Sequence, residues 1–203
     1  MEIKLNATQQ AAVLATNGST LIIAGAGSGK TRVITCRISH LLKSGTSPRS
    51  IVALTFTNKA AKEMKERIGK QTHMMPFVGT FHSYCLTLLK KYGYHIGLDS
   101  FTIMDSADQE KLIHDIVKQN RTGKINSKQM VYHISNAKNA LATGDQYYLF
   151  EYDTNMQEIL VKYEGAKKFS KCLDFDDLII KTVELFNKSE FVAQHQANIQ
   201  HIL

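Results

Sequence analysis

The sequence lacks any apolar run that is long enough to cross a membrane. A spanning helix needs about 20 consecutive apolar residues, and no stretch of the 203 residues approaches that length. The first residues, Met1–Lys4, also lack the regions of a signal peptide. These absences exclude the membrane and secreted classes and predict a soluble, cytoplasmic protein that makes no membrane contact.

Cysteine is scarce, and its three residues lie far apart without a Cys-x-x-Cys pair: Cys36, Cys85 and Cys172. An odd and scattered set indicates neither a disulfide framework nor a zinc site. The eight histidines show no metal-ligand spacing either. We therefore expect reduced thiols and no zinc centre.

Basic residues exceed acidic ones, at 25 lysines and arginines against 18 aspartates and glutamates, which gives a net charge of +7. An excess of this size suits a polyanionic partner such as nucleic acid. Many basic proteins bind no polyanion, so the charge leaves this question open. The motifs have to decide it.

A glycine-rich stretch lies near the N-terminus. The apolar run Leu21–Ala24 leads into Gly25-Ala26-Gly27-Ser28-Gly29-Lys30-Thr31, and a helical pattern follows from Arg32. Glycines let backbone N–H groups converge on an anion at a helix N-terminus, where the helix dipole favours negative charge. The pattern predicts a phosphate-binding loop, in which Lys30 reaches the β and γ phosphates and the Thr31 hydroxyl holds Mg²⁺. Its first position is usually glycine and is Ala24 here; the alternative is a plain connecting turn.

Strand and helix patterns alternate over the first half of the chain. The expected strands are Leu21–Ala24, Ile51–Phe56 and Phe77–Phe81, and the expected helices are Thr8–Ala15, Thr31–Lys43, Lys59–Lys70 and Ser83–Tyr92. The second strand is short and apolar on both faces, as a buried parallel strand should be. This alternation predicts an α/β fold with a parallel sheet and right-handed crossovers.

The pattern becomes helical after residue 105. Three segments have helical periodicity and no strand interrupts them: Asp108–Lys118, Ser127–Leu141 and Tyr147–Lys168. A further amphipathic helix begins near Leu173 and runs to about Asn187. We expect a sheet domain over residues 1–104, a small all-helical insertion over 105–170, and a return to the sheet domain over 171–203.

Five stretches stand in a characteristic order along the chain: Leu5–Gln10, the glycine loop, Thr55–Ala61, Gly79–Ser83 and Leu173–Leu178. In this order they closely resemble the N-terminal part of the superfamily 1 DNA helicases of the UvrD/Rep/PcrA type. The resemblance covers the whole chain and is densest over residues 5–83. It implies a RecA-like P-loop NTPase domain (1A) with a helical insertion (1B), and an ATP- and Mg²⁺-dependent helicase that moves 3′ to 5′ on nucleoid DNA in replication or repair.

The resemblance assigns the adenine contact to Gln9. A glutamine amide both donates and accepts, which suits adenine N6 and N7. Gln10 is the alternative if the register differs by one. A further alternative is that Gln9 is simply an exposed helix residue without a ligand. The implied nucleotide-binding residues are Gln9, Ala24, Gly25, Ala26, Gly27, Ser28, Gly29, Lys30, Thr31 and Arg32.

Two stretches that follow strands are implied to bind single-stranded DNA and its junctions with duplex. Their residues are Phe56, Thr57, Asn58, Lys59, Thr80, Phe81 and His82. Phe56 would stack a base of any sequence, and the hydroxyl, amide and lysine groups would hold phosphates. The alternatives are a core position for Phe56 and a structural role for His82.

Three carboxylates open the last helix: Asp174, Asp176 and Asp177. They invite a metal or acid–base role, but carboxylates at a helix start also cap free N–H groups and complement the dipole. We expect the capping role. The resembled family keeps this motif, so a mechanical or nucleotide-linked role stays open.

The chain contains no Asp-Glu-x-x-Asp sequence. The resembled family uses this motif to hold Mg²⁺ and to position the attacking water, and phosphoryl transfer needs such groups. We therefore expect a truncated N-terminal piece whose partner is the C-terminal remainder of the helicase, and which hydrolyses ATP poorly or not at all. A nucleotide-binding regulatory module and a small-molecule P-loop kinase are the alternatives.

Overall fold

The computed structural model describes residues 4–15, 18–119, 126–143 and 154–203. The chain divides into two compact units, of which unit 1 comprises Met1–Tyr84 with Val192–Leu203 and unit 2 comprises Cys85–Phe191. Within the described ranges, no helix is long and apolar enough to cross a membrane. Unit 1 is mixed α/β, and unit 2 is mainly helical. The predicted domain boundaries after residues 104 and 170 remain predictions.

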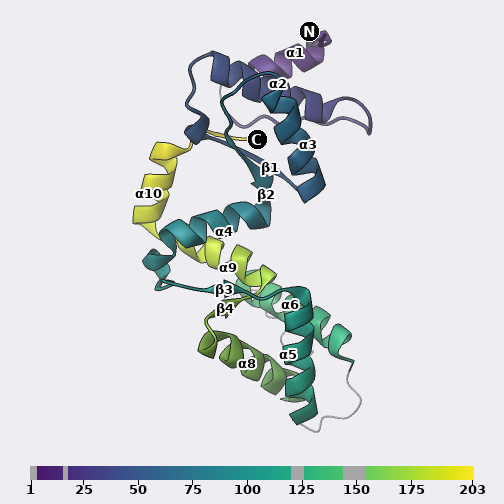
Figure 1. The fold of residues 1–203 in the computed structure, drawn as a ribbon, viewed down its shortest axis with the longest axis vertical. Helices are drawn as coiled ribbons and strands as arrows, with labels where there is room; N and C mark the ends of the chain where they lie inside the picture. The colour runs from purple at the N-terminus through teal and green to yellow at the C-terminus, as the bar shows by residue number, and fades with distance from the viewer. Residues whose placement is uncertain (1–3, 16–17, 120–125, 144–153) are drawn as a thin grey trace. The chain divides into compact units, whose positions relative to one another are not determined.

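Unit 1 contains a parallel sheet of three strands, β1 (Ile51–Thr55), β2 (Phe77–Thr80) and β5 (His201–Ile202), in the order β2-β1-β5. β1 and β2 lie side by side in Figure 1. The register pairs Thr55 with Thr80, so the two strands end at the same edge of the sheet. The predicted parallel sheet is therefore confirmed.

Three helices accompany this sheet: α1 (Ala7–Leu14), α2 (Lys30–Lys43) and α3 (Asn58–Gly69). Two of them, α2 and α3, bury core residues together with the strands: Ile38 and Leu42 from α2, Met64 and Ile68 from α3, and Ile51, Ala53 and Val78 from the sheet. The apolar residues of α2 and α3 recur at helical spacing, so one face of each helix enters this core. The helices predicted from periodicity are confirmed within one or two residues.

The predicted strand at Leu21–Ala24 is wrong. The segment has no regular structure, and the side chains of Leu21 and Ile23 are 85% and 89% exposed. A strand requires a partner backbone, and this segment pairs with no strand of the described sheet, whose order is β2-β1-β5. Ile22 instead lines a cavity of about 530 Å³ whose lining also includes His201–Leu203, so this segment faces β5 without pairing with it.

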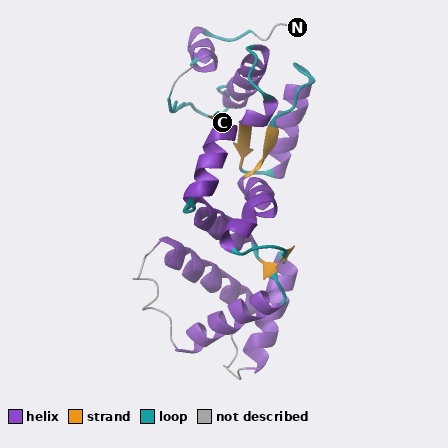
Figure 2. Cartoon of the chain, turned by 90° about the vertical axis from the view of Figure 1, so that its left-hand side faces the viewer, coloured by secondary structure: helices purple, strands orange, loops and turns teal. Residues whose placement is uncertain are grey.

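Unit 2 is built mainly from helices (Figure 2). Three of them, α5 (Ser106–Gln119), α6 (Ser127–Thr143) and α8 (Thr154–Phe169), share a core that includes Ile113, Met130, Ile134, Ile159 and Tyr163. The predicted helices here are confirmed, except that residues 147–153 lie outside the described residues.

The remaining elements of unit 2 include α9 (Phe175–Phe186), the 3₁₀ turn Gly93–Ile96 and a parallel pair of two-residue strands, β3 (Thr102–Ile103) and β4 (Cys172–Leu173). Two helices, α4 (Phe81–Tyr92) and α10 (Ser189–Asn198), continue from one unit into the other along the chain. The sequence analysis missed the helix α10. It also missed β3 and β4, because a strand of two residues shows no periodicity. Leu173 belongs to β4 rather than to the helix that follows it.

Candidate nucleotide and DNA site

The N-terminus of α2 is open to solvent. Its N-cap residue is Gly29, which has a φ of 93° and no side-chain cap. The first helical hydrogen bond runs from the N–H of Val33 to the carbonyl of Gly29, at 3.0 Å. The N–H groups of the first turn therefore have no partner within the helix. Together with the helix dipole they provide a site that fits a phosphate.

Lys30 folds back over the glycine loop. Its Nζ donates to the carbonyl oxygens of Ala24 and Gly25, at 2.7 Å in each case, and the hydroxyl of Ser28 donates to Gly25 at the same distance. Both the loop and the ammonium group are exposed. Ala24 contributes only its carbonyl, so the absence of glycine at this position does not disturb the contact.

Gln9 reaches the same loop from α1. Its side chain forms a capping box with Asn6, in which the Asn6 N–H donates to Gln9 Oε1 and the Gln9 N–H donates to Asn6 Oδ1. The Gln9 Nε2 donates to the carbonyl of Ser28 at 3.0 Å, across 19 residues of chain. The φ of 93° favours glycine at position 29, and a Cβ there would also lie 3.0 Å from this Nε2, so the Gln9 side chain would have to shift slightly. Gln9, rather than Gln10, is thus the glutamine that contacts the loop.

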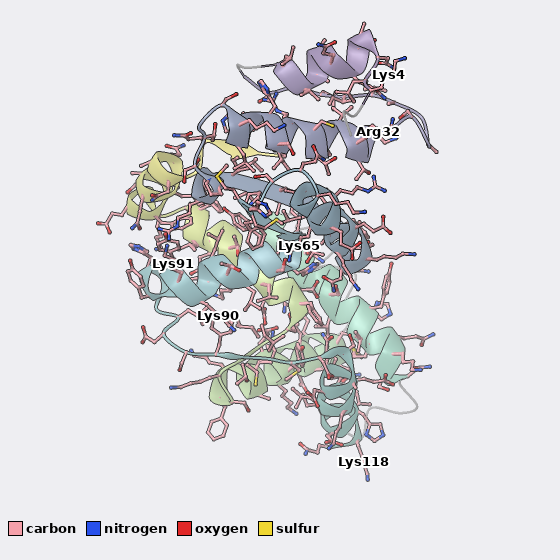
Figure 3. All side chains as sticks on the ribbon, turned by 45° about the horizontal axis from the view of Figure 1, so that its top comes forward. Lys4, Arg32, Lys65, Lys90, Lys91 and Lys118 are labelled. Atoms are coloured by element: carbon pink, nitrogen blue, oxygen red, sulfur yellow. The ribbon has the colours of Figure 1, made fainter. Side chains whose placement is uncertain are left out.

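The hydroxyl of Thr31 is the predicted Mg²⁺ ligand beside the loop, and Thr31 is exposed at the start of α2. Arg32, which Figure 3 labels, is exposed next to it and is a cation rather than a metal ligand. Mg²⁺ is usually held by one or two carboxylates together with phosphate oxygens and water. The Thr31 hydroxyl fits one position of such a set, and the other ligands would have to come from the nucleotide, from water, or from acids outside this loop.

The carboxyl edge of the sheet carries the first predicted DNA-binding stretch. Phe56 directly follows β1 and is 93% exposed, so it is not a core residue. Thr57 caps α3, since its hydroxyl oxygen accepts from the N–H of Ala60 at 3.1 Å. Asn58 and Lys59 lie exposed in the first turn of that helix. An aromatic ring and polar groups are therefore presented together.

The second stretch lies beside the first, because β1 and β2 end in register at Thr55 and Thr80. Thr80 is buried, and its hydroxyl oxygen accepts from the N–H of Ser83 at 3.2 Å. Phe81 is 54% exposed and His82 is exposed. Phe81 and His82 are accessible to a ligand at this edge, whereas the Thr80 side chain is engaged locally.

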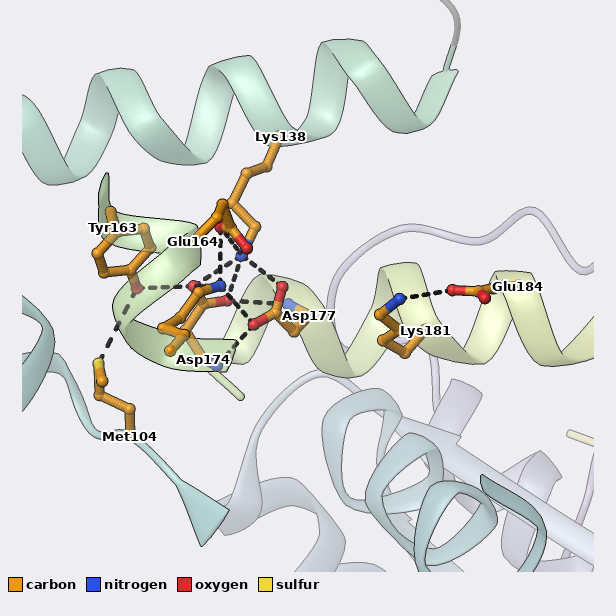
Figure 4. Close-up of polar contacts among 9 residues, drawn as sticks. Met104, Lys138, Tyr163, Glu164, Asp174, Asp177, Lys181 and Glu184 are labelled. Carbon is orange, nitrogen blue, oxygen red and sulfur yellow. Dashed lines mark hydrogen bonds and ion pairs between the residues drawn. The ribbon is translucent and has the colours of Figure 1, made fainter. Parts of the chain in front are cut away.

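The carboxylates that open α9 occupy a different setting in unit 2. Asp174 and Asp177 are buried and form a reciprocal capping box, which confirms the predicted capping role; Asp176 is only partly buried. Lys138 Nζ lies 2.7 Å from both oxygens of Asp174 and 2.6 Å from Asp177 Oδ1. Lys167 Nζ lies 2.8 Å from Asp174 Oδ2 and 2.6 Å from Asp177 Oδ2. Figure 4 shows this buried ion cluster.

Two further side chains complete the buried ion cluster. The Tyr163 hydroxyl donates to Asp174 Oδ2 at 2.7 Å, and Glu164 Oε1 lies 2.8 Å from Lys167 Nζ. Burial alone would raise the pKa of Asp174, but the ammonium groups of Lys138 and Lys167 hold it well below its usual value. Burial and the neighbouring Asp174 carboxylate raise the pKa of Tyr163, so this phenol stays protonated.

The acidic group Glu164, Asp174 and Asp177 has ligand atoms within 4.8 Å of one another. A divalent cation would have to displace two ammonium groups that already lie between these carboxylates. The geometry is therefore that of a structural ion cluster. The sequence analysis missed the two lysines, because Lys138 lies 36 residues from Asp174 and no local pattern joins them.

The fold and the loop define a mixed α/β protein with a parallel sheet and an uncapped, solvent-exposed helix start after a glycine loop. Comparison with protein families makes this class specific. The model of the UvrD/REP helicase N-terminal domain matches residues 5–203, and the chain therefore belongs to that family.

The chain is similar to two curated staphylococcal proteins named ATP-dependent DNA helicase PcrA. It is 40% identical to the protein of Staphylococcus aureus and 39% identical to that of Staphylococcus epidermidis, in each case over 98% of the chain. The match covers 29% of each of these relatives, so the chain spans less than a third of their length. The resemblance to the UvrD/Rep/PcrA helicases is confirmed.

Proposed function

We propose that this chain is the ATP- and single-stranded-DNA-binding N-terminal part of an ATP-dependent DNA helicase, with a RecA-like P-loop NTPase domain. The observation that carries the proposal is the uncapped N-terminus of α2, where Lys30 Nζ donates to two carbonyls of the glycine loop. The names of the similar proteins support the same activity. A regulatory module or a small-molecule kinase has no comparable support.

The nucleotide would bind by exchange of contacts that the loop now makes with itself. Lys30 would leave the carbonyls of Ala24 and Gly25 for phosphate oxygens, and charge-assisted bonds of this kind are stronger than neutral ones. The Gln9 amide would turn from Ser28 to the adenine edge. The Thr31 hydroxyl would hold Mg²⁺ in part, and the bound ion would supply positive charge that neutralises the phosphates. Arg32 would lie near the nucleotide from the same helix turn.

Single-stranded DNA would bind at the carboxyl edge of the sheet. Phe56 would stack a base, and Thr57, Asn58 and Lys59 would contact phosphates beside Phe81 and His82. Such stacking is independent of base identity, as translocation from 3′ to 5′ over arbitrary sequence requires. Because α5, α6 and α8 share one core, we also propose residues 105–170 as the helical insertion of the sheet domain.

Hydrolysis and unwinding would need groups beyond this chain. No Asp-Glu-x-x-Asp sequence is present, and Asp174 and Asp177 are already paired with lysines. We propose that the acids of that motif come from a C-terminal remainder, that the chain alone binds ATP without efficient turnover, and that the complete helicase acts on single-strand/duplex junctions of nucleoid DNA.

The test is a titration of the chain with a fluorescent ATP analogue in the presence of Mg²⁺. Lys30→Ala should weaken binding about 10-fold to 100-fold, because a hydrogen bond to a charged group contributes about 1.5–3 kcal/mol. Lys43→Ala, at the other end of α2, removes the same charge and should leave the affinity unchanged. Equal affinities for wild type and Lys30→Ala would overturn the phosphate-loop assignment.

The Mg²⁺ ligand can be tested separately. Thr31→Val removes the hydroxyl while it keeps the shape of the side chain. The variant should bind the analogue with the wild-type affinity in EDTA and should lose part of the increase that Mg²⁺ gives the wild type. A full Mg²⁺ response in this variant would contradict the role of Thr31.

A further inference from the structure

Phe169 ends α8 with a side chain that is 92% exposed. Among the described phenylalanines only Phe56, at 93%, is exposed to the same extent; the next, Phe81, is 54% exposed. A single exposed apolar residue needs no explanation by itself. The residues around Phe169 give it one.

Two exposed lysines flank this ring along the chain. Lys168 and Lys171 are exposed and line a cavity of about 630 Å³ in unit 2. The other charged residues that line the cavity are Asp99, Glu164, Lys167, Asp177 and Lys181. Of these, Lys181 is paired with Glu184 at 2.7 Å, and Glu164, Lys167 and Asp177 belong to the buried ion cluster. The exposed lysines of this lining are Lys168 and Lys171, and the carboxylate of Asp99 is exposed there as well.

Lys171 has a φ of 50°, the one positive value among the non-glycine residues that the structure describes. This left-handed conformation follows the end of α8, where the Lys171 N–H donates to the Lys168 carbonyl at 3.2 Å. Glycine is the usual residue at such a position, because a Cβ is strained there. A cation complements the negative end of a helix dipole, which accounts for Lys168. It does not account for a strained lysine or for the exposed ring.

The segment repeats the chemistry of the predicted DNA-binding stretch in unit 1. In each case a nearly fully exposed phenylalanine lies beside a hydroxyl residue and within three residues of lysine: Phe56-Thr57-Asn58-Lys59 and Lys168-Phe169-Ser170-Lys171. An aromatic face for a base and cations for the neighbouring phosphates are the two parts of a single-strand contact.

We propose that Phe169, Lys168 and Lys171 form a second contact for single-stranded nucleic acid. One base would stack on the Phe169 ring, while Lys168 and Lys171 would hold the flanking phosphates. The proposal rests on the proposed function only in taking DNA as the ligand. It requires neither Phe56 nor the nucleotide loop.

The chain has no tryptophan, so single tryptophans report stacking without background. Phe169→Trp, Phe56→Trp and, as a control, Tyr132→Trp on α6, where the tyrosine is 64% exposed, are each titrated with an oligothymidylate of about 16 nucleotides. We expect saturable quenching of Phe169→Trp and no quenching of the control. Circular dichroism verifies that each variant is folded.

The outcomes separate this proposal from the proposed function. Quenching of Phe56→Trp without quenching of Phe169→Trp overturns the second contact and leaves the first intact. Quenching of Phe169→Trp alone supports the second contact and contradicts the role of Phe56. No quenching of either overturns both. A Phe169→Trp signal that changes with protein concentration in the absence of DNA assigns the ring to a contact between copies and overturns the nucleic-acid reading.

Lys171→Gly provides the sharper test. Glycine relieves the left-handed strain and keeps the backbone bond from the Thr102 N–H to the residue 171 carbonyl, 3.0 Å long, so the thermal midpoint should stay the same or rise. Loss of one phosphate contact should lower the slope of log K against log salt by about 0.7. A structural role predicts no change in that slope, and an unchanged slope would remove Lys171 from the contact. The control is Lys188→Ala, which removes a comparable charge from the link between α9 and α10.

Discussion

The two units distribute charge in opposite ways. The residues of unit 1 include 11 lysines and arginines against 3 acidic residues, whereas unit 2 has 14 against 15. Unit 1 therefore carries the whole positive excess, and its polar groups at the start of α2 and after β1 face solvent. Unit 2 buries lysines and aspartates against one another. Polar groups left open are candidates for ligand binding, while buried and mutually satisfied ones hold the fold together.

The largest expected effect breaks the satisfied side of this comparison. Lys138→Met removes an ammonium group that contacts both Asp174 and Asp177, and loss of one partner from a buried ion pair costs about 3–5 kcal/mol. Urea denaturation should show this decrease in the free energy of unfolding. Lys118→Met, at the exposed residue labelled on α5 in Figure 3, should change it by less than about 0.5 kcal/mol. Similar values for the two variants would mean that the cluster does not stabilise unit 2.

Acid should weaken the same cluster. The pKa of Asp174 is lower in the folded chain than its ordinary value, chiefly because Lys138 and Lys167 offset the effect of burial. The stability that this group contributes is therefore present above the unfolded pKa of about 3.9 and is lost as pH falls below it. The free energy of unfolding, measured by urea denaturation at a series of pH values, should fall below about pH 4. In Asp174→Asn, which is already destabilised, this acid-dependent part should be smaller; an identical pH profile would contradict the assignment.

Local chemistry accounts for what the sequence predicted well. Helical periodicity located α2, α3, α5 and α6, and the capping residue Asp174 marked the start of α9. The glycine loop could be predicted because a left-handed backbone at the start of a helix favours glycine, and Gly29 has a φ of 93° there. These features depend on residues a few positions apart.

Features that depend on distant partners could not be predicted in this way. Leu21–Ala24 has the composition of a buried strand, but a strand exists only where another backbone pairs with it. Lys138 of the buried ion cluster shows no signal in its own helix, since its acidic partners Asp174 and Asp177 lie 36 and 39 residues away. The exposure of Phe56, too, was settled by the tertiary fold, because β1 ends one residue before it.

An effect of intermediate size tests the open side of unit 1. Phe56→Ala should weaken binding of oligothymidylate by about 1–3 kcal/mol, because it removes a stacking face. Its free energy of unfolding should hardly change, since the ring is 93% exposed. Fluorescence anisotropy with a labelled oligonucleotide measures the first quantity. Tyr94→Ala, at an aromatic residue of unit 2 that is 58% exposed, is the matched control, and equal losses in the two variants would refute a specific role for Phe56.

The smallest expected effect concerns the side chain of Asn6 in unit 1, whose Oδ1 accepts a hydrogen bond from the Gln9 N–H close to the exposed glycine loop. Asn6→Ala removes the oxygen that accepts from the Gln9 N–H, and loss of such a cap costs about 1 kcal/mol. The backbone N–H of residue 6 that donates to Gln9 Oε1 remains in this variant, so the expected effect comes from the weakened first turn of α1, which carries the Gln9 side chain to Ser28. The variant should bind ATP more weakly while its affinity for inorganic triphosphate stays unchanged. Asn6→Asp keeps an oxygen at the cap and should behave as wild type in both titrations. A parallel loss for ATP and triphosphate would show that the cap supports the loop as a whole and does not position Gln9 for the base.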